Sequence, residues 1–404
     1  DELRRAVVTW LASDEGGELV ERHPIGLQGD RPLAGDIRPC SVPGEGATVV
    51  AGESRSIGGV PVRRTLAVLA AVTLVAALLA TGAFAADRIT WKVPFLERDR
   101  DTLEAWCGTT GPPVIAPQPL APAPQSASLS DGFDEPLQPD QIVIVTWNLH
   151  GGAADLAGLV GQLRSGALTD GEPVSRFVLL LQEAYRAGAV VPRAMTGGVR
   201  APRAVGLGAN GRTRIDIVSL AQSLGLALYY VPSMRNGAPA DTNEDRGNAV
   251  LSTEPLSDFA AIELPFERQR RVAIAATVSA SAPDGGAWTL RVASVHLEST
   301  ASARHLWILA SGARVRQARG LLDALRPLDS LVVGGDFNTW FGYSDPTYRT
   351  LAAALPDAAP GDRRKTFGRL FRLDHLFAQP PDGWTVTTRR LDDRLGSDHY
   401  PLLA

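Results

Sequence analysis

Hydrophobic and polar positions divide the chain into a C-terminal part with a strand-like pattern, from residue 141 onward, and an N-terminal part without one. Short runs rich in Val, Ile and Leu recur after residue 141, separated by glycine-rich and polar turns. They predict strands at 141–147, 177–181, 226–231, 248–252, 272–278, 288–297, 330–333, 373–377 and 384–388. Helical periodicity predicts one strong helix at 302–325 and weaker ones at 153–163 and 214–224. Many strands with few helices favour a layered α/β or α+β domain with more than one sheet over 141–404.

The N-terminal part reads as three segments. Residues 1–62 show no regular periodicity, and we expect either a poorly structured tail or an over-extended gene model. Residues 65–85 form an uncharged run of 21 residues that follows an arginine pair and ends in an A-x-A pattern, so 63–86 is a signal peptide or a transmembrane anchor. Residues 87–140 are rich in proline and predict a linker.

The arginine pair before the apolar run sets the expected location of the protein. Positive charges tend to stay in the cytoplasm, so the residues after the run are exported. We therefore expect the 141–404 domain in the periplasm or the extracellular space. It stays anchored to the membrane through residues 65–85 if that segment is not cleaved.

Composition and charge exclude several function classes. The 404 residues contain 40 Lys+Arg and 44 Asp+Glu, a net charge of -4, which lacks the overall basic character of many nucleic-acid binders. Residues 141–404 contain 28 Lys+Arg and 25 Asp+Glu, a net charge of +3. Cys40 and Cys107 are the only cysteines, so a bound metal needs oxygen and imidazole ligands. The motifs of acyl transfer, NTP hydrolysis and hydride transfer are absent from the sequence.

Carboxylate, amide and imidazole side chains follow five or six of the hydrophobic runs. They are Asn148 and His150, Glu183, His296, Asp336 and Asn338, Asp374, and finally Asp398 and His399. Burying such groups is costly unless they are paired or coordinated, so one crevice lined by all of them explains them together. Oxygen ligands of this kind suit Mg²⁺, with Mn²⁺ or Ca²⁺ as the other candidates, better than they suit zinc.

Seven short sequence fragments follow one another over residues 141–404. They are WNLHG at 147–151, LQE at 181–183, RGNAVLS at 246–252, VHL at 295–297, GDFN at 335–338, DH at 374–375 and SDHYP at 397–401. Together they resemble the endonuclease/exonuclease/phosphatase superfamily, which has the DNase I-like fold. The resemblance implies an α/β (α+β) four-layer sandwich, in which two β-sheets pack face to face and are flanked by helices. It also implies divalent-metal-dependent hydrolysis of a phosphate ester at one end of the sandwich.

The resemblance also assigns roles around the metal and the attacking water. Glu183 is the principal metal ligand, helped by Asn148 and Asp398. Asp336 orients or deprotonates the water, and Asn338 steadies the water and the developing phosphorane oxygens. Whether one metal or two act is left open.

Further roles concern the substrate. His399 contacts the scissile phosphate, and Asp374 holds the ring of His399. His296 protonates the leaving oxygen. Asn248 binds the phosphate or organises the neighbouring carboxylates, and Arg246 is assigned to substrate binding, with a solvated surface arginine as its alternative.

Several questions stay open from the sequence. Some family members carry a second acidic ligand where this chain has His150, whose role is undecided. Relatives hydrolyse nucleic acid, sphingomyelin-type phospholipid or inositol phosphate, and we place nucleic acid first. A non-catalytic binding module with the same fold is the competing interpretation, but the presence of Glu183, Asp336 and His399 favours an enzyme. We expect a monomer.

Overall fold

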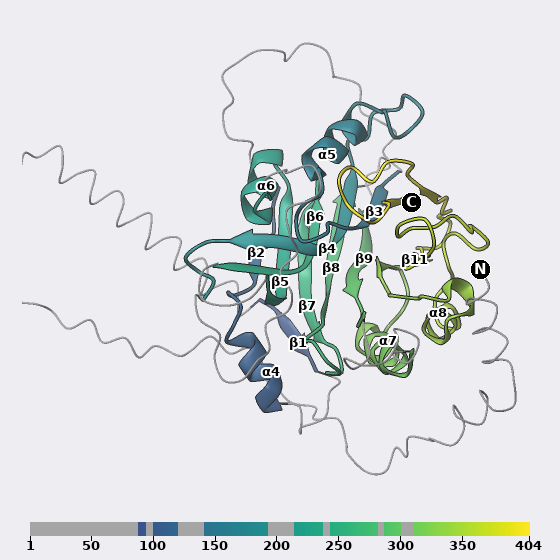
Figure 1. Cartoon of the computed structure of the whole chain (residues 1–404). Coiled ribbons are helices and arrows are strands. Elements are labelled where there is room, and N and C mark those ends of the chain that lie inside the picture. Colours follow the sequence, from purple (N-terminus) through teal and green to yellow (C-terminus); the bar gives the residue numbers. More distant parts are fainter. Residues whose placement is uncertain are drawn as a thin grey trace, which may run out of the picture. The chain divides into compact units, whose positions relative to one another are not determined.

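The computed structural model describes residues 88–93, 100–119, 141–192, 214–236, 243–281, 287–299 and 311–404. The expected tail at 1–62 and the apolar segment at 63–86 lie outside these ranges. Within them, every helix is too short or too polar to cross a bilayer. The described residues build two mixed β-sheets and the helices that cover them (Figure 1).

One sheet has seven strands in the order β12-β13-β3-β4-β6-β5-β2. Strands β3 and β4 run parallel, and the other neighbouring pairs are antiparallel. The strands are β2 (Val114–Ala116), β3 (Val143–Asn148), β4 (Phe177–Ala187), β5 (Ala227–Arg235), β6 (Glu244–Ser252), β12 (Arg389–Arg390) and β13 (Leu402–Leu403).

The other sheet has six strands in the order β1-β7-β8-β9-β10-β11. Here β1 runs parallel to β7 and β9 parallel to β10, while the remaining pairs are antiparallel. The strands are β1 (Thr90–Lys92), β7 (Leu256–Glu263), β8 (Val272–Ser281), β9 (Ala287–His296), β10 (Leu331–Asp336) and β11 (Asp374–Gln379).

Side chains alternate along each strand, so one set fills the space between the sheets and the other packs under helices. On β3, Ile144 joins the cluster between the sheets, whereas Val145 and Trp147 join the cluster beneath the helices. Helices α5 (Leu156–Arg164) and α6 (Ile217–Leu224) cover the outer face of the seven-stranded sheet.

Two further helices cover the outer face of the six-stranded sheet. Helices α7 (Ser311–Leu325) and α8 (Pro346–Ala352) bury apolar side chains against strands β9 and β10 in a third cluster (Figure 1). The resulting order is helices, sheet, sheet, helices. This confirms the predicted four-layer, DNase I-like sandwich.

Eight of the nine predicted strands are present in the structure. The run at 384–388 is not a strand, because its apolar character serves packing: the Trp384 ring meets Trp288 edge-on, with centroids 5.2 Å apart. Strand β7 was not predicted. Its pairing with β8 shifts register between Ser257 and Ala260, and this bulge interrupts the hydrophobic alternation that reveals a strand.

The three predicted helices are present, and α5 and α6 each begin three residues later than predicted. The patterns at 153–163, 214–224 and 302–325 correspond to α5, α6 and α7, although residues 301–310 lie outside the described ranges. Both α5 and α6 begin after an aspartate N-cap, because the Asp155 side chain accepts from the Gly158 amide and the Asp216 side chain from those of Val218 and Ser219.

Residues 87–140 are not a linker throughout, contrary to the expectation from their composition. Strand β1 pairs with β7, and β2 pairs with β5, so this segment adds an outer strand to each sheet. Helix α4 (Arg100–Cys107) lies between them in the sequence and buries Leu103 and Trp106. The proline-rich residues 120–140 lie outside the described ranges.

A buried cluster fastens this segment to the seven-stranded sheet. Asp245 of β6 accepts hydrogen bonds from the backbone nitrogen of Gly111 (2.8 Å) and the hydroxyl of Tyr230 (2.8 Å). Arg186 of β4 forms an ion pair with Asp245, and its Nη1 donates to the carbonyl of Pro112 (2.6 Å). The ion pair is almost fully buried, so its charges depend on one another.

Candidate active site

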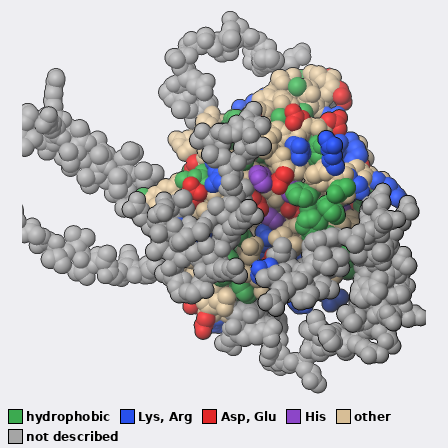
Figure 2. Space-filling model, viewed as in Figure 1, with side chains coloured by type: hydrophobic (Ala, Val, Ile, Leu, Met, Phe, Trp, Pro, Cys, Tyr) green, Lys and Arg blue, Asp and Glu red, His purple; other side chains and the backbone are tan. Residues whose placement is uncertain are grey.

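The predicted site residues surround one cavity of about 460 Å³, and histidine and acidic side chains gather on this face of the molecule (Figure 2). Eight of the ten line the cavity: Asn148, Glu183, Arg246, His296, Asp336, Asn338, Asp398 and His399. Of the other two, Asp374 contacts the ring of His399, and Asn248 lines a small adjoining pocket. Side chains of five strands (β3, β4, β6, β9 and β10) and of the C-terminal loop therefore converge on one cavity, as the sequence predicts.

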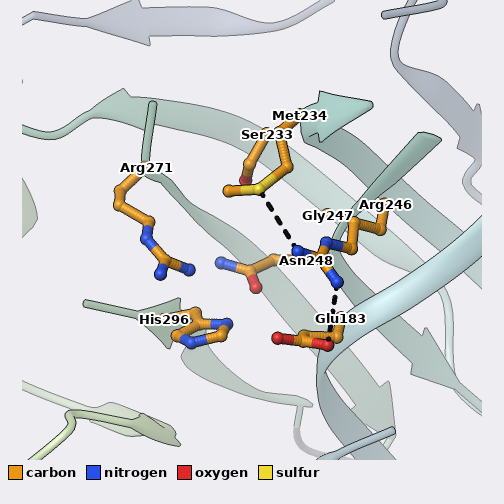
Figure 3. Close-up of a pocket in the computed structure, with 8 residues that line it drawn as sticks. All are labelled: Glu183, Ser233, Met234, Arg246, Gly247, Asn248, Arg271 and His296. Carbon is orange, nitrogen blue, oxygen red and sulfur yellow. Dashed lines mark hydrogen bonds and ion pairs between the residues drawn. The ribbon is translucent and has the colours of Figure 1, made fainter. Parts of the chain in front are cut away.

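Glu183 reaches the cavity because β4 has a bulge at this point. The register of β4 against β6 shifts between Leu181 and Ala184, and Glu183 itself has a left-handed φ of 51°. A left-handed conformation is unusual for a residue other than glycine and tends to occur at functional sites. Figure 3 shows the Glu183 carboxylate turned toward Arg246, whose Nη1 lies 3.4 Å from Oε2.

Asn248 occupies a different position from the one expected for a phosphate ligand. Its Nδ2 donates to the carbonyls of Val272 (2.7 Å) and Ser294 (3.2 Å), which joins the two sheets (Figure 3). An amide nitrogen has two hydrogens, and both are used here. In this arrangement Asn248 cannot donate to a phosphate oxygen, and its position supports the alternative role of organising the residues around Glu183.

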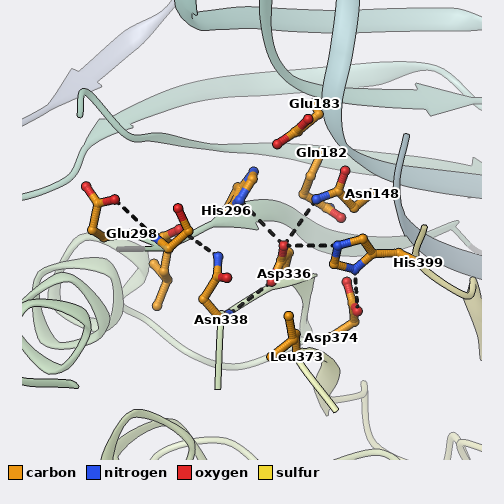
Figure 4. Close-up of polar contacts among 12 residues, drawn as sticks. Asn148, Gln182, Glu183, His296, Glu298, Asp336, Asn338, Leu373, Asp374 and His399 are labelled. Carbon is orange, nitrogen blue, oxygen red and sulfur yellow. Dashed lines mark hydrogen bonds and ion pairs between the residues drawn. The ribbon is translucent and has the colours of Figure 1, made fainter. Parts of the chain in front are cut away.

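Asp336 lies at the centre of the polar contacts (Figure 4). Its Oδ2 accepts from Nδ2 of Asn148 (3.1 Å) and lies 3.5 Å from Nε2 of His296 and 3.7 Å from Nε2 of His399. Its Oδ1 accepts from the backbone nitrogen of Asn338 (3.0 Å). Asn338, like Glu183, has a φ of 51°. Every hydrogen bond and ion pair of the Asp336 side chain therefore comes from a residue that the sequence places in the site.

Two glycines allow the strand ends around Asp336 to approach closely. A Cβ at Gly335 would lie 2.0 Å from the carbonyl oxygen of Val295 on β9, and one at Gly334 would lie 2.7 Å from Cβ of Thr146 on β3. No real Cβ tolerates such contacts, so larger residues would push β10 away from both neighbours. The GG pair before Asp336 thus fixes the spacing of β3, β9 and β10 at the site.

His399 is held between carboxylates. Its Nδ1 lies 2.8 Å from Oδ2 of Asp374, and its Nε2 faces Asp336 and Asp398. Burial lowers the pKa of His399, but the three carboxylates outweigh burial and raise the pKa to about 10. Burial raises the pKa of Asp336 to about 6, against the opposing effect of His399. At neutral pH the site therefore holds an imidazolium beside an ionised Asp336.

The expected role of His296 as a proton donor stays a prediction, and burial of the ring bears on it. Burial, with the nearby charge of Arg271, holds the pKa of His296 well below its usual value of 6.5. A neutral imidazole is a poor acid for a leaving oxygen near pH 7. Of the two histidines that face Asp336, His399 carries the proton.

His150, whose role the sequence left undecided, belongs to the site. Its Nδ1 lies 3.0 Å from Oδ2 of Asp398, and its backbone nitrogen donates to Oδ1 of Asn148 (3.0 Å). The hydrogen bond with Asp398 raises the pKa of His150, against the opposing effect of burial. Burial of Asp398 raises the pKa of its carboxyl group, but the same hydrogen bond and the charge of His399 outweigh burial and lower it. His150 thus keeps Asp398 ionised at the cavity wall.

The sequence as a whole agrees with this geometry. The model of the endonuclease/exonuclease/phosphatase family matches residues 145–399. The chain belongs to this family. Its members are hydrolases that act on phosphate esters, and so is this protein.

Three solved structures match the chain at low sequence identity. Sphingomyelinase C from Streptomyces griseocarneus is 19% identical, with a TM-score of 0.36 and coverage of 65% of this chain and 97% of that chain. An AP endonuclease from Archaeoglobus fulgidus is 14% identical, with a TM-score of 0.39 and coverage of 65% and 98%. Beta toxin from Staphylococcus aureus, solved with bound magnesium ions, is 14% identical, with a TM-score of 0.37 and the same coverage. Among curated proteins, none matches this sequence.

The residues of this family member fit a divalent cation. Glu183, Asp398 and Asn148 present oxygen atoms to one cavity, and Oδ1 of Asp398 is buried without a hydrogen bond. An oxygen-rich donor set of this kind suits Mg²⁺. The ligand atoms of Asp336, Asp374 and His399 also lie within 4.8 Å of one another. His399 is protonated and bonded to Asp374, however, so the cluster around Glu183 is the better cation site.

The sequence did not reveal the apolar wall of the cavity. Trp340, Phe367 and Leu373 also line the cavity, and the Phe367 ring centroid lies 4.7 Å from that of His399. Trp340 meets Phe367 edge-on at 6.0 Å. In the sequence these apolar residues look like ordinary core residues. An isolated β-bridge between Phe367 and His399 brings Phe367 to the site.

Proposed function

We propose that this hydrolase is a divalent-metal-dependent phosphodiesterase, with nucleic acid as the favoured substrate and phospholipid or inositol phosphate as the alternatives. The observation that carries the proposal is the array Asp374–His399–Asp336, in which a protonated imidazole and an ionised carboxylate share one cavity with Glu183. Asp336 supplies a base, the His399 imidazolium a positive charge, and Glu183 a metal ligand. Metal-assisted hydrolysis of a phosphate ester uses all three.

Each side chain has a distinct task in this mechanism. Glu183, Asn148 and Asp398 would hold a divalent cation, which would supply positive charge to the phosphoryl oxygens. Asp336, with a pKa of about 6, is ionised at neutral pH and accepts a proton from the attacking water. Asn148 and the backbone of Asn338 hold the two oxygens of Asp336 in place. Protonated His399 donates to a phosphoryl oxygen and stabilises its growing charge.

The shape of the cavity supports a diester. A phosphodiester carries an organic group on both sides of the phosphorus, and one of these needs a surface away from the metal. The wall formed by Trp340, Phe367 and Leu373 offers an apolar surface beside His399. The guanidinium of Arg246 makes two long contacts, to Oε2 of Glu183 at 3.4 Å and to Sδ of Met234 at 3.7 Å. We infer that it binds negative charge of the substrate.

The test is hydrolysis of bis-p-nitrophenyl phosphate by the full chain with Mg²⁺, with and without EDTA. We expect turnover that EDTA abolishes and excess Mg²⁺ restores, and slower turnover of the monoester p-nitrophenyl phosphate. Asp336→Asn should lower the rate by about two powers of ten or more. Asp382→Asn removes an exposed carboxylate and should leave the rate unchanged. Metal-independent turnover, or a near-native Asp336→Asn rate, would contradict the proposal.

We also propose that the catalytic domain acts outside the cytoplasm. The support comes from the sequence alone, in the arginine pair and the uncharged run at 65–85. Cell fractionation with N-terminal sequencing of the recovered protein tests the proposal. Recovery of the protein from the cytoplasm would contradict it.

A further inference from the structure

Positive charge is concentrated in two segments beside the cavity. Residues 361–372 and 389–396 together contain 8 Lys+Arg and 3 Asp+Glu, a net charge of +5. The whole of residues 141–404 has a net charge of only +3, so the remainder of the domain is slightly acidic. The overall charge therefore conceals a local basic surface of the kind that binds polyanions.

Hydrogen bonds join these two segments to each other and to the catalytic loop. Nη1 of Arg364 donates to the carbonyl of Arg390 (3.2 Å). The backbone nitrogen of Tyr400 donates to the carbonyl of Thr366 (2.7 Å), and that of Gly368 donates to the carbonyl of Asp398 (3.2 Å). The two basic segments therefore adjoin the wall of the cavity. Figure 2 shows basic side chains gathered next to a hydrophobic patch and the histidines of this face.

Three of these positive charges are available to a ligand. Arg363, Arg369 and Arg394 are exposed and have no acidic partner within the described parts of the chain. By contrast, Arg364 is paired with Asp362. We call Arg363, Arg369 and Arg394 the arginine surface. Arg369 follows Gly368, which is bonded to the carbonyl of Asp398, and Arg394 lies over the ring of Tyr400, so both adjoin the residues of the cavity.

Ring systems accompany the arginine surface. The Arg394 guanidinium lies 5.5 Å from the centroid of the Tyr400 ring, and the rings of Phe367 and Trp340 form the adjoining cavity wall. Proteins that bind single-stranded nucleic acid combine a basic track with aromatic faces for the bases. A bilayer surface would instead need several exposed apolar side chains. In the two segments Leu370 is the one large apolar side chain that is strongly exposed, at 67%.

We propose that the arginine surface binds the phosphodiester backbone of a nucleic-acid strand on one side of the scissile phosphate. This inference rests on the proposed phosphodiesterase function and names its substrate class. Each arginine neutralises one backbone phosphate beyond the cavity. The cavity cleaves one ester, and the arginine surface holds the strand that continues from it.

The test compares two triple variants of the full chain. The first carries Arg363→Ser, Arg369→Ser and Arg394→Ser. The control carries Arg319→Ser, Arg326→Ser and Arg349→Ser, which removes three exposed arginines that do not line the cavity. Thermal unfolding of both variants shows whether they fold as the wild type does. Binding of a fluorescent 20-nucleotide single strand is measured by anisotropy without added metal, at 50 and 200 mM NaCl.

We expect the first variant to bind the strand at least about tenfold more weakly at 50 mM NaCl. Its dependence of log affinity on log salt should be smaller by about 2, because three phosphate contacts at ~0.7 each are lost. The control variant should match the wild type on both counts. Both variants should hydrolyse bis-p-nitrophenyl phosphate at the wild-type rate, since this small diester does not reach the arginine surface.

Three outcomes would overturn the inference. They are a wild type that does not bind the strand, a first variant with unchanged affinity and salt dependence, and an equal loss in the control variant. Co-sedimentation with phosphatidylcholine vesicles containing 30% phosphatidylserine that the first variant alone loses, with strand binding intact, would assign the surface to an anionic bilayer instead. Failure of the proposed function is separate, because it shows as absent diester hydrolysis in the wild type whatever the strand binding.

Discussion

Nδ1 of His399 lies 2.8 Å from Oδ2 of Asp374, on the side of the ring away from Asp336. Both residues are almost fully buried, at 4% and 1% exposure. A buried imidazole would normally lose its proton, and here the carboxylate of Asp374 keeps it. The electrostatic character of the cavity therefore depends on a residue that does not line it.

Asp374→Asn should lower kcat by roughly 10–100-fold, because an amide orients the His399 ring without stabilising its charge. The pKa of His399 should fall as well, so the alkaline limb of the pH–rate profile should move to lower pH. Steady-state kinetics on bis-p-nitrophenyl phosphate from pH 6 to 10 measure both effects. Asp382→Asn is the matched control on an exposed aspartate. A reduced rate with an unmoved alkaline limb would mean that Asp374 acts only on structure.

The pH dependence of kcat/KM should be bell-shaped. Asp336 acts in its ionised form, so activity should fall as the pH drops through about 6. His399 acts in its protonated form, so activity should fall as the pH rises through about 10. Nitrogen NMR of the metal-free protein checks the assignment directly. At pH 7.5 we expect His399 as an imidazolium and His296 as a neutral ring, and the reverse pattern would refute the roles given to the two histidines.

Glu183→Gln should weaken Mg²⁺ binding by about tenfold or more, because it removes the charge of the expected principal ligand. Isothermal titration of the EDTA-treated protein with MgCl₂ gives the affinity without relying on activity. Glu172→Gln changes an exposed glutamate and should leave the affinity at the wild-type value. Equal affinity in wild type and Glu183→Gln would move the cation to the cluster of Asp336, Asp374 and His399.

Asp245→Asn should lower the free energy of unfolding by about 3 kcal/mol or more, because it leaves Arg186 buried without its counter-charge. Urea unfolding followed by tryptophan fluorescence measures this change. Asp323→Asn breaks the exposed pair with Arg326 and should cost about 0.5 kcal/mol or less. If the two variants lose the same stability, the buried cluster does not fasten the N-terminal segment as the contacts indicate.

Much of the fold follows from local pattern, and the exceptions have local causes. Alternating or continuous apolar runs identified β3, β4 and β10, since burial imposes a period that a sequence displays. Strands β1 and β2 escaped because each is a three-residue edge strand within a proline-rich segment. Such short strands are set by their partners rather than by their own residues.

The site was predictable where buried strands ended in groups that need partners. That reasoning located Asp336 and Glu183 correctly at one cavity. It could not assign protons, because the pKa values of His296 and His399 depend on which carboxylates each ring meets in space. It also could not tell whether Asn248 binds a phosphate or joins the two sheets, because an amide group donates equally well to a phosphate oxygen and to a backbone carbonyl.

Strands β1 and β2 each cover the margin of a sheet, and this governs how the enzyme can be shortened. A version that starts at residue 141 would leave the backbone of β7 and β5 unpaired along one margin of each sheet. Unpaired margins recruit strands from other molecules. We expect such a trimmed protein to self-associate. Because self-association could itself abolish activity, an inactive preparation of it would not test the role of Asp336.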